Sequence, residues 1–199
     1  MARKVKLGVL GSTNGTDLQA IIDAIERKEL DAEIVLVASD KEDAIILQRA
    51  AKHGIATFSV DYKRFGNRSD AEAAVVIELR KREAELILLI GFMKILTPYF
   101  VKEFRGRIWN IHPSLLPKYA GGMNLEVHAQ VIHNHEKETG CTLHEVVETL
   151  DGGKILMQKK CEVVDGETTE TLKAKVQKLE QECLLEAIKM VSDGRLVIG

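Results

Sequence analysis

The stretch that decides the fold of this 199-residue chain is Leu86-Ile87-Leu88-Leu89-Ile90, five apolar residues in succession. A strand that is apolar on both faces is typical of the buried centre of a parallel sheet. Before it, short apolar strands are expected at 5–10, 34–38 and 56–60, and each is followed by a segment with helical periodicity, beginning near residue 18 and covering 42–53 and 68–83. Strands that alternate with helices in this way predict a doubly wound α/β fold with a mostly parallel sheet.

The pattern changes after residue 100. One more strand is expected over 107–111, then a helix over 125–134, two strands over 142–147 and 155–164, and a long helix over 168–191. The last two strands are joined through Asp151-Gly152-Gly153, which predicts an antiparallel C-terminal part. Thr168 or Thr169 can cap the last helix, and Asp193-Gly194 can end it. No repeat or linker divides the chain, so residues 1–199 are expected to form one domain.

The composition excludes several classes of function. The net charge is −2, which disfavours non-specific binding to nucleic acid. Cys141, Cys161 and Cys183 are odd in number and contain no CxxC pair, so reduced thiols are expected rather than disulfides or a zinc site. No apolar run approaches the roughly 20 residues that a membrane span needs. A cytoplasmic protein without a membrane partner is therefore expected.

The richest chemistry lies in Trp109-Asn110-Ile111-His112-Pro113-Ser114-Leu115-Leu116-Pro117, which holds two of the three prolines of the chain. Proline removes a backbone donor, so a strand cannot continue through this run. Asn110 and His112 are two residues apart at the strand end, where alternation places both on one face. The pair could present a hydrogen-bond donor and an acid/base group together, or the run could be a turn with an incidental histidine.

Two further segments could supply complementary chemistry. The loop Gly11-Ser12-Thr13-Asn14-Gly15-Thr16 opens the first helix, where free amides and glycines can bind a phosphate; the alternative is a tight turn. Asp17 would repel that phosphate unless its carboxylate points away. Asp151 stands in a turn sequence, yet an ionised Asp beside a histidine would raise the pKa of the imidazole and hold its tautomer.

The other histidines favour no metal site, because the chain has neither an HExxH motif nor a Cys/His set. His128 follows the 117–122 loop on a helix and could reach the same cleft as His112. His144 alternates with apolar residues in its strand, which predicts a half-exposed side chain, and with His128 it is a further candidate site residue.

Residues 91–96, 110–117 and 150–153, in this order, resemble the folate-dependent formyltransferase family, and the resemblance extends over nearly the whole chain. It implies a single-domain, Rossmann-like fold of the formyltransferase type, with a phosphate-binding half over about residues 1–100 and a catalytic and folate-binding half over about 101–199. Within the family, the resemblance is to members that formylate glycinamide ribonucleotide. It therefore implies transfer of a formyl group from 10-formyltetrahydrofolate, as co-substrate and without a metal, to the amine of that ribonucleotide.

The resemblance also implies which residues form the site. Asn110, His112 and Asp151 are the implied catalytic set: Asn110 and a protonated His112 stabilise an oxyanion, and Asp151 keeps His112 charged and helps to move a proton. The residues implied to bind the phosphate and ribose are Gly15, Thr16, Asp17, Gln177 and Glu180. Those implied to bind the folate are Arg68, Phe92, Met93, Lys94, Ile95, Leu96, Val147, Glu148, Thr149 and Leu150. The only partners expected are small molecules, and the protein is expected to be a monomer or a homodimer.

Three alternative functions are compatible with the same residues. Methionyl-tRNA formyltransferase carries an additional tRNA-binding domain, and formyltetrahydrofolate hydrolase an additional regulatory domain, so the length of this chain disfavours both. The third alternative is a non-catalytic module that binds a phosphosugar or folate, which the complete set of Asn110, His112 and Asp151 disfavours.

Overall fold

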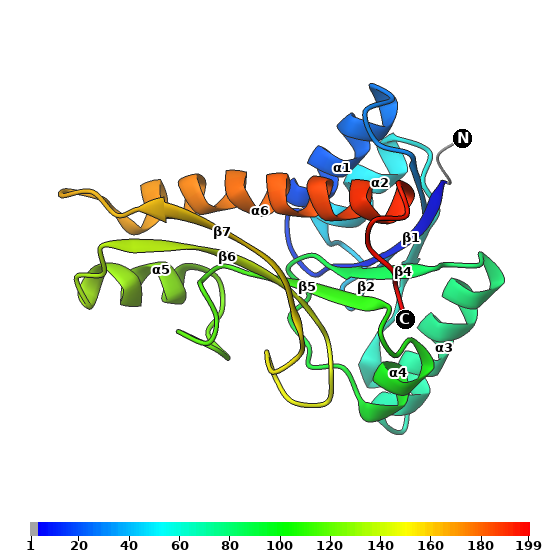
Figure 1. Ribbon diagram of the computed structural model, residues 1–199. Coiled ribbons are helices and arrows are strands. Elements are labelled where there is room, and N and C mark those ends of the chain that lie inside the picture. The colour runs from blue at the N-terminus through cyan, green and yellow to red at the C-terminus, as the bar shows by residue number, and fades with distance from the viewer. Residues whose placement is uncertain (1–3) are drawn as a thin grey trace.

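The sheet of this protein has seven strands in the order β3-β2-β1-β4-β5-β6-β7 (Figure 1). The computed structural model describes residues 4–199, so the first three residues of the expected domain lie outside the described part. The strands are β1 (Val5–Leu10), β2 (Ala32–Ser39), β3 (Thr57–Ser59), β4 (Leu86–Leu89), β5 (Ile108–His112), β6 (Glu138–Glu145) and β7 (Ile155–Glu162). The helices are α1 (Thr16–Glu26), α2 (Ile45–Lys52), α3 (Arg68–Lys81), α4 (Pro98–Glu103), α5 (Asn124–His133) and α6 (Thr169–Ser192), with a 3-10 turn at Tyr62–Arg64.

The strand β4 lies at the middle of this sheet, as its sequence predicts. All four of its residues are buried, and it pairs in parallel with β1 on one side and β5 on the other. The first five strands of the chain are parallel, whereas β6 and β7 are antiparallel to their neighbours. The mostly parallel sheet with an antiparallel C-terminal part is thereby confirmed.

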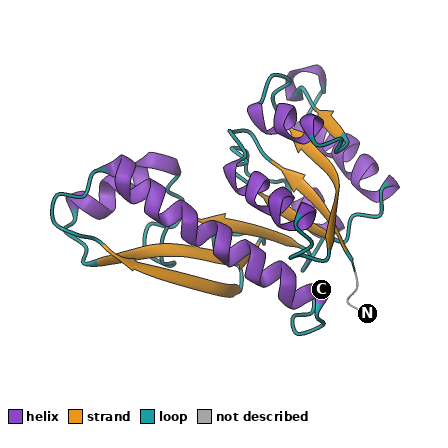
Figure 2. Cartoon of the chain, turned by 90° about the horizontal axis from the view of Figure 1, so that it is seen from above, coloured by secondary structure: helices purple, strands orange, loops and turns teal. Residues whose placement is uncertain are grey.

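Helices cover both faces of the sheet. Residues of α1, α2 and α6 form one hydrophobic core with β1 and β4, and residues of α3 and α4 form a second core on the other face (Figure 1). The long helix α6 crosses the strands of the C-terminal part, seen from above in Figure 2, and it contacts α1, α5, β6 and β7. Within residues 4–199, no helix combines the length and the apolar character that a membrane span requires.

Local capping fixes several helix ends. The Thr168 side chain accepts a hydrogen bond from the backbone N–H of Thr171, and Gly194 follows the C-cap with a φ of 73°. Both ends of α6 therefore agree with the sequence. The helix α4 was not predicted, although Thr97 caps it and Pro98 occupies its first turn. Strand β6 begins at Glu138, four residues before the expected start at Thr142, because Gly140 and Cys141 pair with β7.

The strand order places a crevice at one edge of the sheet. From β1 the chain moves outward to β2 and β3, and it then returns to the other side of β1 for β4 and β5. The carboxyl ends of β1 and β4 flank this change of direction, and ligands of open α/β sheets bind in such crevices. The loop 11–16 and the polar end of β5 both open at this edge.

Candidate active site

A cavity of about 760 Å³ occupies the predicted crevice. Three loops that follow β1, β4 and β5 line it, together with the 146–151 loop and the inner faces of α5 and α6. It is therefore assembled from both halves of the chain. The polar and charged residues in its lining are Thr13, Asn14, Thr16, Asp17, Asn110, His112, His128, His144, Glu148, Thr149, Asp151, Lys173, Gln177 and Glu180.

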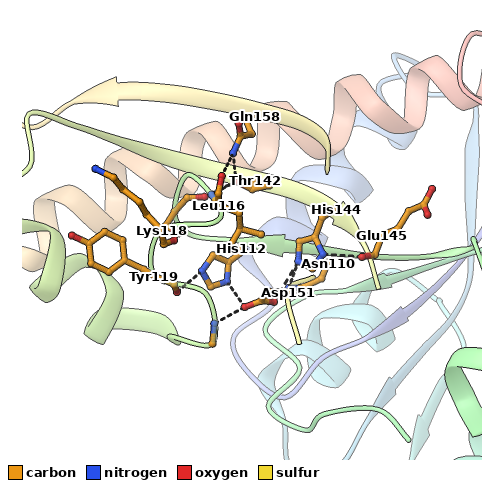
Figure 3. A network of polar contacts seen from close by, with 12 residues as sticks. Asn110, His112, Leu116, Lys118, Tyr119, Thr142, His144, Glu145, Asp151 and Gln158 are labelled. Carbon is orange, nitrogen blue, oxygen red and sulfur yellow. Dashed lines mark hydrogen bonds and ion pairs between the residues drawn. The ribbon is translucent and has the colours of Figure 1, made fainter. Parts of the chain in front are cut away.

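Asn110 and His112 both face this cavity from the end of β5, as alternation predicts. The antiparallel pairing of β5 with β6 places His144 directly opposite Asn110. The Asn110 Nδ2 atom lies 3.2 Å from His144 Nε2 (Figure 3). The Nδ1–H of His144 can donate to the Glu145 carbonyl at 2.9 Å, which leaves its Nε2 to accept from Asn110. An amide has two N–H groups, so Asn110 keeps one for a ligand.

Asp151 reaches the same cluster from the loop between β6 and β7. Its Oδ2 lies 3.4 Å from His112 Nδ1 and accepts a hydrogen bond from the Gly121 N–H at 2.8 Å, and its Oδ1 lies 3.5 Å from His144 Nε2 (Figure 3). The backbone of Asp151 has a φ of 49°, a turn conformation that Asp tolerates better than most residues. Asp151 is thus a turn residue, and its side chain, only 7% exposed, also points at two histidines.

Burial and charge act in opposite directions on His112. Burial lowers its pKa, while the charge of Asp151 and a hydrogen bond to the Tyr119 carbonyl raise it, and the net pKa is lowered. Asp151 therefore raises the pKa of His112, as expected. The net pKa is nevertheless lowered, because the effect of burial is larger than that of Asp151 and the hydrogen bond together. The pKa of Asp151 itself is lowered: burial raises it, but the contact with His144, the hydrogen bond from the Gly121 N–H and the charge of His112 outweigh burial.

The two ring nitrogens of His112 nevertheless both face oxygen acceptors. Nε2 lies 3.0 Å from the Tyr119 carbonyl, and Nδ1 faces the Asp151 carboxylate. A neutral imidazole has a single N–H and can donate to only one of them, whereas the imidazolium donates to both. The site is therefore built to accept a second proton on His112 when negative charge develops nearby.

His144 differs from its expected environment. The sequence predicts a half-exposed strand histidine, but the residue is only 2% exposed, because the 146–151 loop folds back so that Asp151 lies beside the ring. His128 does line the cavity from α5 and is equally buried.

The loop after β5 is held in place by polar contacts with the next two strands. Thr142 Oγ1 donates to the Ser114 carbonyl at 2.7 Å and accepts from the Leu116 N–H at 3.0 Å, and Gln158 of β7 donates to both Thr142 and the Leu116 carbonyl (Figure 3). These contacts satisfy backbone groups that the prolines leave without strand partners. They fix the position at which the Asn110–His112 strand end opens to the cavity.

The loop after β1 forms the other end of the cavity. Gly15 caps α1 with a φ of 65°, and a Cβ atom there would lie 2.5 Å from Cγ1 of Ile46, so this position requires glycine. Thr16 accepts a hydrogen bond from Gln177 Nε2 of α6. The loop and α6 are therefore joined across the cavity.

Two carboxyl groups are buried beside this loop. Asp17 is 7% exposed, and its Oδ1 has no hydrogen-bond partner among the described residues. Burial raises the pKa of Asp17 from 3.8 to about 6, against a hydrogen bond from Gln181. Burial, followed by the charge of Asp17, also raises the pKa of Glu180 well above its ordinary value. This end of the cavity therefore disfavours the charged forms of both carboxyls.

The substitution Asp17→Asn is expected to stabilise the protein at pH 8 by about 2–3 kcal/mol, because a pKa raised from 3.8 to about 6 makes ionisation of Asp17 costly in the folded state. In the wild type, ionisation of Asp17 lowers the stability of the folded state as pH increases from about 4 to about 6. The stabilisation by Asp17→Asn should therefore vanish below about pH 4. Urea unfolding at pH 8 and at pH 4 measures it. The control is Asp31→Asn at an exposed position, which should change little. An equal gain at both pH values would contradict this electrostatic origin.

The residues predicted to bind the folate divide into two groups. Two of them do not line the cavity: Lys94 forms an ion pair with Asp40, with Nζ 3.5 Å from Oδ2, and Arg68 donates to the Ile95 carbonyl. Their role in binding the folate stays a prediction. The predicted residues that do line the cavity are Phe92, Met93, Ile95, Leu96, Val147, Glu148, Thr149 and Leu150.

Lys173 is a lining residue that was not predicted. It shares one face of α6 with Gln177 and Glu180, at positions i, i+4 and i+7. That spacing is visible in the sequence and could have identified it once the other two residues were assigned. Without that assignment, a lysine on an amphipathic helix indicates only a solvated face.

The chain is similar to known proteins in both sequence and structure. A family model described as formyl transferase matches residues 5–188. The phosphoribosylglycinamide formyltransferase of Escherichia coli K12 is 39% identical over 188 residues, which are 94% of this chain and 87% of that protein. A trifunctional purine biosynthetic protein of Gallus gallus is 40% identical over 98% of this chain, which spans only 19% of that longer protein.

Solved structures agree with the sequence comparison. The phosphoribosylglycinamide formyltransferase of Coxiella burnetii superposes with a TM-score of 0.91 at 39% identity, covering 98% of this chain and 90% of that one. A glycinamide ribonucleotide transformylase of Symbiobacterium toebii also gives a TM-score of 0.91, at 35% identity, covering 98% of this chain and 91% of that one. The chain belongs to the formyl transferase family.

Proposed function

We propose that the protein transfers the formyl group of 10-formyltetrahydrofolate to the amine of glycinamide ribonucleotide, a step of de novo purine biosynthesis. The observation that carries the proposal is the cluster of Asn110, His112 and Asp151 at one cavity, with a glycine-containing helix N-terminus at its other end. The names of the relatives in E. coli and C. burnetii support the choice of acceptor.

In this proposal Asn110 and His112 act on the oxygen of the formyl group. When the substrate amine attacks the formyl carbon, that oxygen gains negative charge. Asn110 has a free N–H for it, and His112 becomes a stronger donor as the imidazolium, the form that its two acceptors favour. Donors placed in advance around an oxyanion typically contribute about 10²–10³ in rate.

In this proposal Asp151 accepts and passes on the proton that the reaction releases. Its carboxylate, whose pKa is lowered, supports the charge of His112 and lies where it can accept a proton from the attacking amine. That proton must finally reach the folate nitrogen that leaves, directly or through water. Proton transfer by a positioned group contributes about 10²–10⁴ in rate.

The two substrates are proposed to enter from different sides. The loop 13–17 and the face of α6 with Gln177 and Glu180 receive the phosphate and ribose, while residues 92–96 and 147–150 receive the folate. The proposed reaction takes place in the cytoplasm, where the free thiols of Cys141, Cys161 and Cys183 stay reduced.

The experiment that tests the proposal mixes the purified protein with 10-formyltetrahydrofolate and follows the folate product by absorbance, with and without glycinamide ribonucleotide. Product that forms only when the ribonucleotide is present supports the transferase. Product at the same rate without it would indicate a hydrolase. No product in either case would favour a non-catalytic binding module.

A further inference from the structure

The cavity has an unusual balance of charge for the substrate proposed above. Four carboxyl groups line it, those of Asp17, Glu148, Asp151 and Glu180, but Lys173 is the only lysine or arginine among the described lining residues. A phosphate monoester carries about −1.5 to −2 charge at pH 7. The carboxyls repel such an anion, and Lys173 is the cation of the described lining that can offset them.

Lys173 lies one helical turn from the residue of α6 that contacts the phosphate loop. Lys173 precedes Gln177 by four residues, so the two lie on one face about 6 Å apart along the helix axis. Gln177 donates to Thr16, the first residue of α1, which fixes this part of α6 next to the loop. A lysine side chain of four methylenes is about as long as one helical turn, so the ammonium can reach the loop that Gln177 contacts.

The electrostatic influence of Lys173 shows which groups it faces. Its charge, after the larger contribution of burial, lowers the pKa of His128 to about 4, and it also counteracts the raised pKa of Glu180. The ammonium therefore acts on α5 and α6 together. Lys173 is exposed at the wall of the cavity, so its charge is accessible to a ligand.

His128 adds an independent sign of a ligand. The residue is 2% exposed and lines the cavity, yet its Nδ1 has no hydrogen-bond partner among the described residues. Buried polar atoms are nearly always paired, and an exception in a cavity is readily explained by a ligand or water that is bound there. A neutral imidazole can supply one N–H to an anion from this position.

We infer that Lys173 and His128 form the second side of the phosphate subsite, opposite the backbone amides of the 13–17 loop. Lys173 supplies the positive charge and His128 a neutral hydrogen bond to the same phosphate monoester. The two residues come from different helices, so the phosphate also joins α5 to α6. At pH 7, above the raised pKa of about 6, Asp17 is largely ionised, and the charge of Lys173 offsets its repulsion of the phosphate.

This inference rests on the proposed function, and its test removes the charge and the phosphate separately. Steady-state rates are measured for the wild type and Lys173→Met with glycinamide ribonucleotide and with its dephosphorylated ribonucleoside. The variant should raise KM for the ribonucleotide by about 10- to 100-fold, the worth of a charged hydrogen bond, and leave kcat nearly unchanged. It should not alter kcat/KM for the ribonucleoside. His128→Ala should raise KM for the ribonucleotide by about three- to tenfold.

The matched control is Lys178→Met, which removes an exposed lysine of the same helix that does not line the cavity and should leave both substrates unaffected. An equal loss on ribonucleotide and ribonucleoside, or no loss on either, would overturn the inference.

A second measurement separates failure of the inference from failure of the proposed function. Calorimetric titration with inorganic phosphate requires no turnover. The wild type should bind phosphate and Lys173→Met should bind it at least tenfold more weakly, even if the ribonucleotide is not the acceptor. Equal phosphate binding by the two proteins would overturn the subsite, whereas absence of formyl transfer by the wild type would overturn the proposed function alone.

Discussion

His112→Ala is expected to lower kcat for formyl transfer by about a thousandfold or more, while the fold and the binding of substrates persist. The variant removes a donor to the developing oxyanion together with the imidazolium that Asp151 supports; oxyanion donors are typically worth about 10²–10³ in rate and acid/base groups about 10²–10⁴. The side chain is nearly buried but stands at the cavity wall, so its loss leaves space that water can fill. The measurement is a single-turnover rate at saturating substrate.

The matched control for this variant is His133→Ala, which removes an exposed histidine from α5 and should retain the full rate. Circular dichroism and a thermal melt establish that both variants are folded. A His112→Ala protein that turns over at a near-normal rate would remove His112 from the chemistry.

Asp151→Asn is expected to lower kcat by about 10²–10⁴-fold, the range for loss of a positioned acid/base group. The substitution is nearly isosteric, and asparagine also tolerates the φ of 49° and can still accept the Gly121 N–H, so the loop should keep its shape. What disappears is the negative charge beside His112. The change thus isolates electrostatics from structure.

The pH dependence gives this variant a second readout. The charge of Asp151 raises the pKa of His112 against the effect of burial, so its removal should lower that pKa further. Activity that depends on the imidazolium decreases as pH rises through the pKa of His112. The alkaline limb of the kcat/KM profile should therefore shift to lower pH in Asp151→Asn. A profile that keeps its position while the rate falls would mean that Asp151 acts without influencing His112.

The fold was predictable to a large extent because its signals are local. The five apolar residues at 86–90 placed a central strand correctly, and capping residues at Thr168 and Gly194 marked the ends of α6. The helix α4 is shorter than two turns, so its apolar periodicity is too brief to detect, and only the Thr97-Pro98 pair signals it. The early start of β6 depends on pairing with β7, which a local pattern does not contain.

The site was predictable where residues share one strand and less so where they meet across the fold. Alternation alone placed Asn110 and His112 on one face, and both line the cavity. That Asp151 meets them depends on a loop some 40 residues away, and the resemblance to a family supplied that connection. The burial of His144 and the lowered pKa of His112 both arise from the way this loop packs. The sequence therefore predicted the exposure of His144 wrongly and did not predict that the net pKa of His112 is lowered.

The most direct test of the proposed chemistry follows the formyl carbon itself. The protein is given 10-formyltetrahydrofolate with an isotopic label in the formyl group, together with glycinamide ribonucleotide, and the products are examined by mass spectrometry and NMR. The label should appear on the amine of the ribonucleotide, and His112→Ala and Asp151→Asn should both suppress this product. Label recovered as free formate, or on the ribonucleotide at an undiminished rate in both variants, would contradict the proposed site and its chemistry.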